Sequence, residues 1–120
     1  MDTSPVTNRS WGTYQVISGG TRWLTRLNTI IPGAATAMQR HKGRTEHWLV
    51  LEGSGALMHR ADDVIGDRVF GDRVMSEGDT AVIHPMEWRK IKNVGSVPLV
   101  LIETWIGSLE EDGLIGLVGT

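Results

Sequence analysis

Residues 39–53 read Gln39-Arg40-His41-Lys42-Gly43-Arg44-Thr45-Glu46-His47-Trp48-Leu49-Val50-Leu51-Glu52-Gly53. His41 and Glu46 belong to the residue types that bind metal ions through imidazole and carboxylate groups. After Glu46 the segment becomes rich in the aromatic and aliphatic residues that favour a half-buried strand. Gly53 then begins a turn, where glycine tolerates the backbone angles that other residues avoid. The stretch therefore predicts a β-strand over Glu46–Glu52 beside two candidate metal ligands.

The rest of the chain repeats this pattern of short strands and tight turns. Fifteen glycines and four prolines separate runs rich in Val, Ile, Leu, Thr and Trp, and no long helical period appears. Besides Glu46–Glu52, we predict strands at Tyr14–Ile17, Trp23–Ile31, Ala35–Met38, Gly55–Arg60, Arg68–Met75, Thr80–Ile83, Trp88–Asn93 and Leu99–Ile106. Such a series indicates an all-β sandwich or barrel.

Two segments are expected to stand apart from the strands. Residues 61–72 contain four aspartates and two glycines, and we predict a loop or extended hairpin inserted on one rim. The tail after Ser108 is acidic and then glycine-rich. We expect this tail either to be partly loose or to pack on a partner.

Length and composition narrow the classes of function. A chain of 120 residues is sized for one domain with a genuine core. With 12 basic and 14 acidic side chains and no block of like charge, nucleic acid and anionic membranes are not expected partners. Cysteine is absent, so any metal would bind imidazole, carboxylate or water. The polar start and the lack of a long apolar run favour a cytoplasmic protein.

The segment around His41 resembles the first metal-binding motif of the cupin superfamily. It is most similar to the cupin domain of type II mannose-6-phosphate isomerases, the C-terminal domain of mannose-1-phosphate guanylyltransferase/mannose-6-phosphate isomerases, whose typical phrase is Gln-x-His-x-His-Arg-x-Glu-His-Trp. Gly43 stands where that branch has its second histidine. Residues 9–14 and 98–112 resemble the opening and closing segments of the family, and residues 77–95 resemble the second cupin motif. In that motif Arg89 takes the position of the last metal histidine, and Asn93 that of the asparagine.

The resemblance implies a double-stranded β-helix, the jelly-roll barrel of cupins, over a single domain of residues 1–120. About residues 9–112 match the family, and residues 1–8 and 113–120 are expected to be terminal extensions. Because strands alternate their side chains, Glu46 facing inward implies that His47 faces outward and Trp48 inward. The resemblance also implies a homodimer more often than a monomer.

The metal site of the family is incomplete in this sequence. His41 and Glu46 are the two ligands that remain, whereas a metal site normally needs three or four protein donors. Arg89 has no lone pair to donate and stays protonated. We therefore expect either no metal or a weakly bound divalent ion, and we hypothesise that the Arg89 cation replaces the metal opposite Glu46. His59 and His84 stay open as substitute ligands.

The resemblance implies an aldose-ketose isomerase that interconverts mannose 6-phosphate and fructose 6-phosphate. His41 or Glu46 would then be the base and Arg89 the electrophile. Gln39, Arg44 and Trp48 would bind the sugar phosphate, with Arg22 and Arg26 as further candidates for the phosphate. Two alternatives stay open: a non-catalytic cupin that binds a carbohydrate or sugar phosphate, and a metal-independent sugar isomerase or epimerase with His41 as base.

Overall fold

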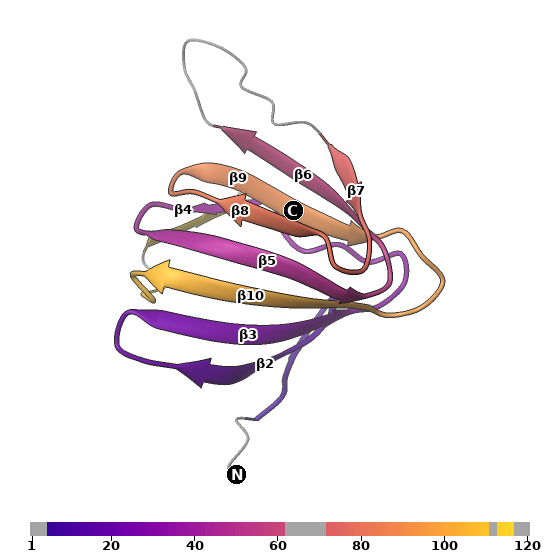
Figure 1. The fold of residues 1–120 in the computed structure, drawn as a ribbon, viewed down its shortest axis with the longest axis horizontal. Coiled ribbons are helices and arrows are strands. Elements are labelled where there is room, and N and C mark those ends of the chain that lie inside the picture. Colours follow the sequence, from indigo (N-terminus) through magenta and orange to yellow (C-terminus); the bar gives the residue numbers. More distant parts are fainter. Residues whose placement is uncertain (1–4, 62–71, 111–112, 117–120) are drawn as a thin grey trace.

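The computed structural model describes residues 5–61, 72–110 and 113–116. In these ranges the strands form two antiparallel sheets that face each other (Figure 1). The six-stranded sheet has the order β1 (Thr7–Arg9), β2 (Gly12–Gly19), β3 (Trp23–Ile30), β10 (Leu99–Gly107), β5 (Arg44–Glu52) and β8 (Thr80–Ile83). The five-stranded sheet has the order β11 (Leu114–Gly116), β4 (Gln39–His41), β9 (Glu87–Asn93), β6 (Gly55–Ala61) and β7 (Arg73–Met75). The prediction of an all-β protein is confirmed.

Most predicted strands are present within two residues of their expected ends, but the predicted strand Ala35–Met38 is wrong. This segment makes one isolated bridge, between Ala35 and Lys92, and the strand begins only at Gln39. The backbone N–H of Ile91 donates to the hydroxyl of Thr36 at 3.1 Å instead of to a carbonyl group. The side chain of Thr36 thus interrupts the ladder.

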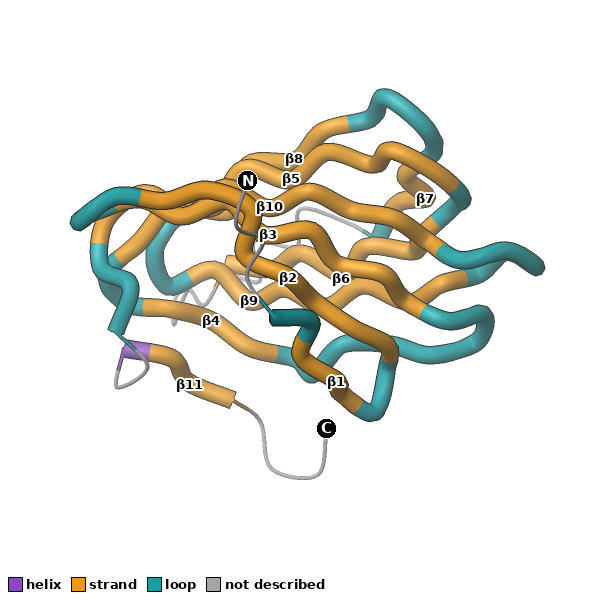
Figure 2. The backbone as a smooth tube through the Cα atoms, turned by 90° about the horizontal axis from the view of Figure 1, so that it is seen from below, coloured by secondary structure: helices purple, strands orange, loops and turns teal. Residues whose placement is uncertain are grey.

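Two short strands lie where the sequence predicted terminal extensions. β1 overlaps the end of residues 1–8, and β11 falls within residues 113–120. β11 pairs with β4 and forms one edge of the five-stranded sheet (Figure 2). The predicted insertion over residues 61–72 and the start of the predicted strand Arg68–Met75 fall largely on residues 62–71, which lie outside the described residues.

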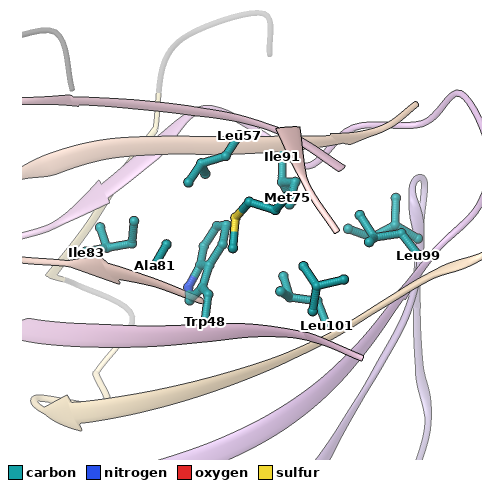
Figure 3. Close-up of a cluster of buried hydrophobic side chains, with 10 residues drawn as sticks. Trp48, Leu57, Met75, Ala81, Ile83, Ile91, Leu99 and Leu101 are labelled. Carbon is teal, nitrogen blue, oxygen red and sulfur yellow. The ribbon is translucent and has the colours of Figure 1, made fainter. Parts of the chain in front are cut away.

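The apolar core fills one half of the space between the sheets (Figure 3). Its buried members are Ile30, Trp48, Val50, Leu57, Met75, Ala81, Ile83, Ile91, Leu99 and Leu101. They come from both sheets, as the labelled side chains of β5, β6, β9 and β10 show. Burying these side chains removes apolar surface from water, which is the main force that holds the two sheets together.

The other half of the interior is polar because the inward-facing residues of the central strands change from apolar to charged along each strand. On β10 the inward side chains run from Leu101 to Glu103, and on β9 from Ile91 to Arg89. The antiparallel register places Glu103 opposite Trp48 of β5 and Arg26 of β3. The polar ends of neighbouring strands therefore meet at the same end of the sandwich.

Close contact between β2 and β3 depends on one glycine. Gly12 has a φ of +148°, and a Cβ atom there would overlap the backbone oxygen of Thr29 on β3. Glycine alone lets β2 approach β3 this closely. The adjoining residues Trp11 and Tyr14 are thereby brought over the polar half of the interior.

Candidate functional site

The polar half of the interior opens into a cavity of about 410 Å³. Among the described residues, its wall includes four arginines, four aromatic side chains, one amide and one carboxyl group. These are Arg9, Arg26, Arg44, Arg89, Trp11, Tyr14, Trp48, Trp105, Gln39 and Glu103. The volume lies within the usual range of about 300–1,000 Å³ for small-molecule sites.

Glu46 lies immediately behind the cavity wall and accepts three hydrogen bonds. Its Oε2 accepts one from Arg44 Nε at 2.8 Å and one from Arg89 Nη2 at 2.7 Å. Its Oε1 accepts one from Trp48 Nε1 at 3.0 Å. All four side chains are buried. Glu46 is therefore the shared counter-charge of two buried guanidinium groups.

Opposing effects set the pKa of this carboxyl group. Burial alone would raise the pKa of Glu46, but the charges of Arg89 and Arg44 and the hydrogen bonds from Arg44 and Trp48 outweigh burial and lower it below its ordinary value. Burial also lowers the pKa of the Arg44 guanidinium, against the attraction of Glu46. At neutral pH Glu46 is thus an anion held between two cations.

The arginines of the wall are held by aromatic rings as well as by carboxylates. The guanidinium carbon of Arg44 lies 3.5 Å from the ring centroid of Trp105. That of Arg26 lies 4.1 Å from the Tyr14 ring and 4.8 Å from the Trp105 ring. Such stacking favours a guanidinium over an ammonium group, because the guanidinium is planar and weakly hydrated. The cations therefore have fixed positions before any ligand arrives.

Sequence reasoning missed Glu103, the buried carboxyl group that lines the cavity. Its Oε2 accepts a hydrogen bond from Asn28 Nδ2 at 2.5 Å, and its Oε1 accepts one from Trp105 Nε1 at 3.2 Å. Arg26 Nη2 lies 3.7 Å from its Oε2. Burial raises the pKa of Glu103, although the charge of Arg26 opposes this. The signal was a charged residue at an inward position of the otherwise apolar segment Leu99–Ile106.

His41, like Glu46, does not line the cavity, contrary to the sequence expectation. Its Nδ1 accepts a hydrogen bond from the backbone N–H of Gly43 at 2.9 Å. The other nitrogen, Nε2, lies 2.9 Å from the carbonyl oxygen of Glu110 and must carry the proton to donate to it. Gly113 also packs against the ring. His41 thus holds the segment that leads to β11.

The other predicted residues divide between the cavity and the rest of the molecule. Gln39, Arg44, Trp48 and Arg89 line the cavity together with Arg26, and the expected alternation is present, with Glu46 and Trp48 buried and His47 exposed. Arg22 and His84 are exposed and lie outside the cavity wall. His59 Nε2 lies 2.9 Å from Glu87 Oε1. Neither of the substitute ligands considered from the sequence, His59 and His84, lines the cavity.

Comparison with known proteins assigns the chain to a family. A sequence model of the family described as "Mannose-6-phosphate isomerase C-terminal" matches residues 2–118. The chain belongs to this family. The mannose-1-phosphate guanylyltransferase RfbM of Salmonella typhimurium is 36% identical over 110 residues, which are 91% of this chain and 21% of RfbM. The chain therefore spans about a fifth of the length of this curated relative.

Solved structures confirm the predicted double-stranded β-helix. The capsular polysaccharide assembling protein CapF from Staphylococcus aureus superposes with a TM-score of 0.82 at 19% identity, covering 98% of this chain and 32% of CapF. A Klebsiella pneumoniae protein with a double-stranded β-helix domain superposes with a TM-score of 0.73 at 15% identity, covering 92% of this chain and 87% of that one. At these identities the likeness concerns the fold alone.

The metal that the family resemblance implies does not fit the residues present here. Among residues 5–61, 72–110 and 113–116, no group of three or more His, Cys, Asp or Glu side chains is placed to hold a metal ion. Both ring nitrogens of His41 face backbone groups, and Oε2 of Glu46 is shared by two arginines. Arg89 offers donors only. The groups that face Glu46 are thus the guanidinium groups of Arg44 and Arg89. No described helix is long and apolar enough to cross a bilayer.

Proposed function

We propose that this domain binds an anionic sugar of the sugar-phosphate class, and that buried arginines supply the positive charge that the family resemblance assigns to a metal. Four arginines on the wall outnumber two carboxylates, Glu103 on the wall and Glu46 behind it. A pocket with this excess of fixed cations attracts anions and favours planar, bidentate contact with phosphate.

One observation carries the proposal. Arg89 is only 6% exposed and lines the cavity, yet its Nη1 has no hydrogen-bond partner among the described residues. Arg26 Nε is also buried and has no hydrogen-bond partner among the described residues. An unpaired buried donor costs about 1–3 kcal/mol, and more when it is charged. The oxygens of a phosphate or a sugar hydroxyl group would satisfy both donors.

The aromatic side chains of the wall suit the sugar part of such a ligand. Trp11, Tyr14, Trp48 and Trp105 are among the residues that line the cavity. The apolar face of a pyranose ring can pack on such surfaces, and the indole and phenol groups keep a polar end for hydrogen bonding. The relative RfbM is a mannose-1-phosphate guanylyltransferase, and mannose 1-phosphate is a sugar phosphate too.

Titration calorimetry with mannose 6-phosphate tests the proposal, with mannose and inorganic phosphate as partial ligands and a chelator present throughout. We expect mannose 6-phosphate to bind more tightly than either part, and binding to weaken as salt is added. Arg26→Met removes a cavity cation while keeping an unbranched side chain, and should weaken binding about 10- to 100-fold, as expected for a charge-assisted hydrogen bond.

Arg22→Met is the matched control, because Arg22 is exposed and does not line the cavity. It makes the same change in net charge and should leave binding unaltered. Equal binding by the Arg26→Met and wild-type proteins would count against the proposal, as would a complete dependence of binding on a divalent metal.

A second candidate function is the aldose-ketose isomerisation that the family description names. The specific observation in its favour is that a carboxyl group, Glu103, and Arg89, whose Nη1 has no hydrogen-bond partner among the described residues, line the same cavity. Interconversion of mannose 6-phosphate and fructose 6-phosphate in the presence of chelator is the corresponding assay. The expected homodimer and cytoplasmic location stay predictions.

A further inference from the structure

Proton transfer to and from a sugar carbon needs a group that reaches the ligand and can exchange its proton. The arginines of the wall stay protonated and cannot act as bases. Glu46 is 1% exposed and does not line the cavity, and it is held as an anion by Arg44 and Arg89. His41 faces backbone groups elsewhere. Among the described residues of the wall, the carboxyl group of Glu103 meets the requirement.

The surroundings of Glu103 suit either protonation state. Asn28 donates through Nδ2 to Glu103, while its Oδ1 is buried and has no hydrogen-bond partner among the described residues. A half-turn of this amide would present Oδ1, an acceptor, to a protonated Glu103. Asn28 can therefore pair with the carboxylate as a donor and with the carboxylic acid as an acceptor, which lowers the cost of changing between them.

We propose that Glu103 carries a proton between adjacent carbons of the sugar bound in this cavity. This inference rests on the proposed binding of a sugar phosphate and adds a reaction to it. Arg26, Arg44 and Arg89 hold the ligand, while Glu103 takes part in the chemistry.

The step conserves atoms and charge without an outside reactant. The carboxylate of Glu103 removes the proton from the carbon next to the carbonyl group of the open-chain sugar. The electrons of that C–H bond form the C=C bond of an enediolate, and the carbonyl π electrons move to its oxygen, which accepts a hydrogen bond from Arg89 Nη1. Glu103 returns the proton to the neighbouring carbon, and a hydroxyl proton moves between the two enediol oxygens. The aldose becomes a ketose.

Exchange of carbon-bound hydrogen with solvent separates this role from a merely structural one. Mannose 6-phosphate is incubated with the protein in D₂O and chelator, and deuterium at C2 and C1 is followed by NMR. We expect exchange with the wild-type protein and a loss of about 10²- to 10⁴-fold with Glu103→Gln, the usual contribution of a general base. Calorimetry should give a Kd for Glu103→Gln within about threefold of wild type, because the change leaves the cationic binding groups in place.

The substitution suits the site, because the Gln amide can accept from Trp105 and donate to the unpaired Asn28 Oδ1. Glu52→Gln, at an exposed glutamate of β5, is the matched control and should exchange like wild type. A second readout does not need the Glu103→Gln protein: in Arg26→Met the pH-rate profile should move to higher pH, since Arg26 lowers the pKa of Glu103.

The outcomes are distinct. Binding of mannose 6-phosphate without exchange in the wild-type protein overturns the role of Glu103 and leaves the proposed function standing. Undiminished exchange in Glu103→Gln also overturns it, as does a pH-rate profile that Arg26→Met does not move. Absence of binding overturns both proposals. Exchange that disappears in Glu103→Gln while Kd is kept supports the assignment.

Discussion

Arg89 Nη2 lies 2.7 Å from Glu46 Oε2, although the two residues are 43 positions apart in the sequence. The pair joins β9 of the five-stranded sheet to β5 of the six-stranded sheet. Arg44 shares the same oxygen at 2.8 Å. Arg89 thus stands where the family resemblance places a metal histidine, and its guanidinium group is a cation that belongs to the chain itself.

Glu46→Gln is expected to destabilise the protein by about 3–5 kcal/mol, the usual cost of breaking a buried ion pair, because Arg44 and Arg89 lose their shared counter-charge. Denaturant unfolding measures the change. His47→Gln, one residue along and exposed on the opposite face of β5, is the control and should stay within about 0.5 kcal/mol of wild type. Adding Arg89→Met to Glu46→Gln should cost less than the sum of the two single changes. A stable Glu46→Gln protein would contradict this account.

The pH dependence of stability should carry two opposite contributions. Glu46 has a lowered pKa, so its contribution is full above its ordinary value of 4.5 and is lost as the pH falls through the folded-state pKa. Glu103 has a raised pKa, so the unfolded chain loses this proton first and stability declines as the pH rises from 4.5 to the folded-state value. Glu103→Gln should flatten that decline, as measured by the free energy of unfolding between about pH 4 and 9. An unchanged profile would show that Glu103 does not titrate as described.

Divalent metal is expected to add little to stability or ligand binding. Both ring nitrogens of His41 face backbone groups, and the carboxylate of Glu46 accepts a hydrogen bond from Arg89. Arg89 itself has no lone pair with which to bind a metal ion. A ligand that binds the folded state at 100 times its Kd would stabilise it by about 2.7 kcal/mol. We therefore expect no comparable rise in Tm with zinc or manganese, and no loss of mannose 6-phosphate binding with chelator. One tightly held metal per chain after native purification would refute this prediction.

His41→Ala should loosen the C-terminal segment without touching the cavity. The change removes the hydrogen bonds of the ring to Glu110 and Gly43, worth about 1–2 kcal/mol in unfolding free energy. Hydrogen exchange should rise most at the Lys42 N–H, which donates to the Gly113 carbonyl at 3.0 Å. His84→Ala, at an exposed histidine, is the control. If His41 were the base of an isomerase, this variant would instead lose turnover while keeping its stability.

The architecture was predictable because strand patterns are local. Alternating side chains, glycine turns and the family motifs gave most strands within two residues, and they placed Glu46 and Trp48 inward. The failures occurred where pairing depends on a distant partner. β11 pairs with β4, and the ladder at Ala35 is interrupted by the hydroxyl of Thr36 bonding to β9. No local pattern contains such information.

The candidate site was predictable only in part. The family motifs pointed to Arg89 and Arg44 as site residues. Because an arginine side chain is a cation with hydrogen-bond donors only, its chemistry followed from the residue type. His41 illustrates the opposite case. Its motif position suggested a ligand, but Gly43 and Glu110 occupy its two nitrogens, and a histidine's role depends on what each nitrogen faces.

The sequence by itself determined that this chain forms an all-β fold of the mannose-6-phosphate isomerase C-terminal family and that an arginine stands at residue 89, where the family resemblance places a metal histidine. Only the tertiary structure decided that Glu103 belongs to the cavity and that His41 does not. The physical reason is register: Glu103 faces the cavity because β10 aligns it with Arg26 on one side and Trp48 on the other. Which side chains meet across strands is set by packing of the whole sandwich, and no single segment encodes it.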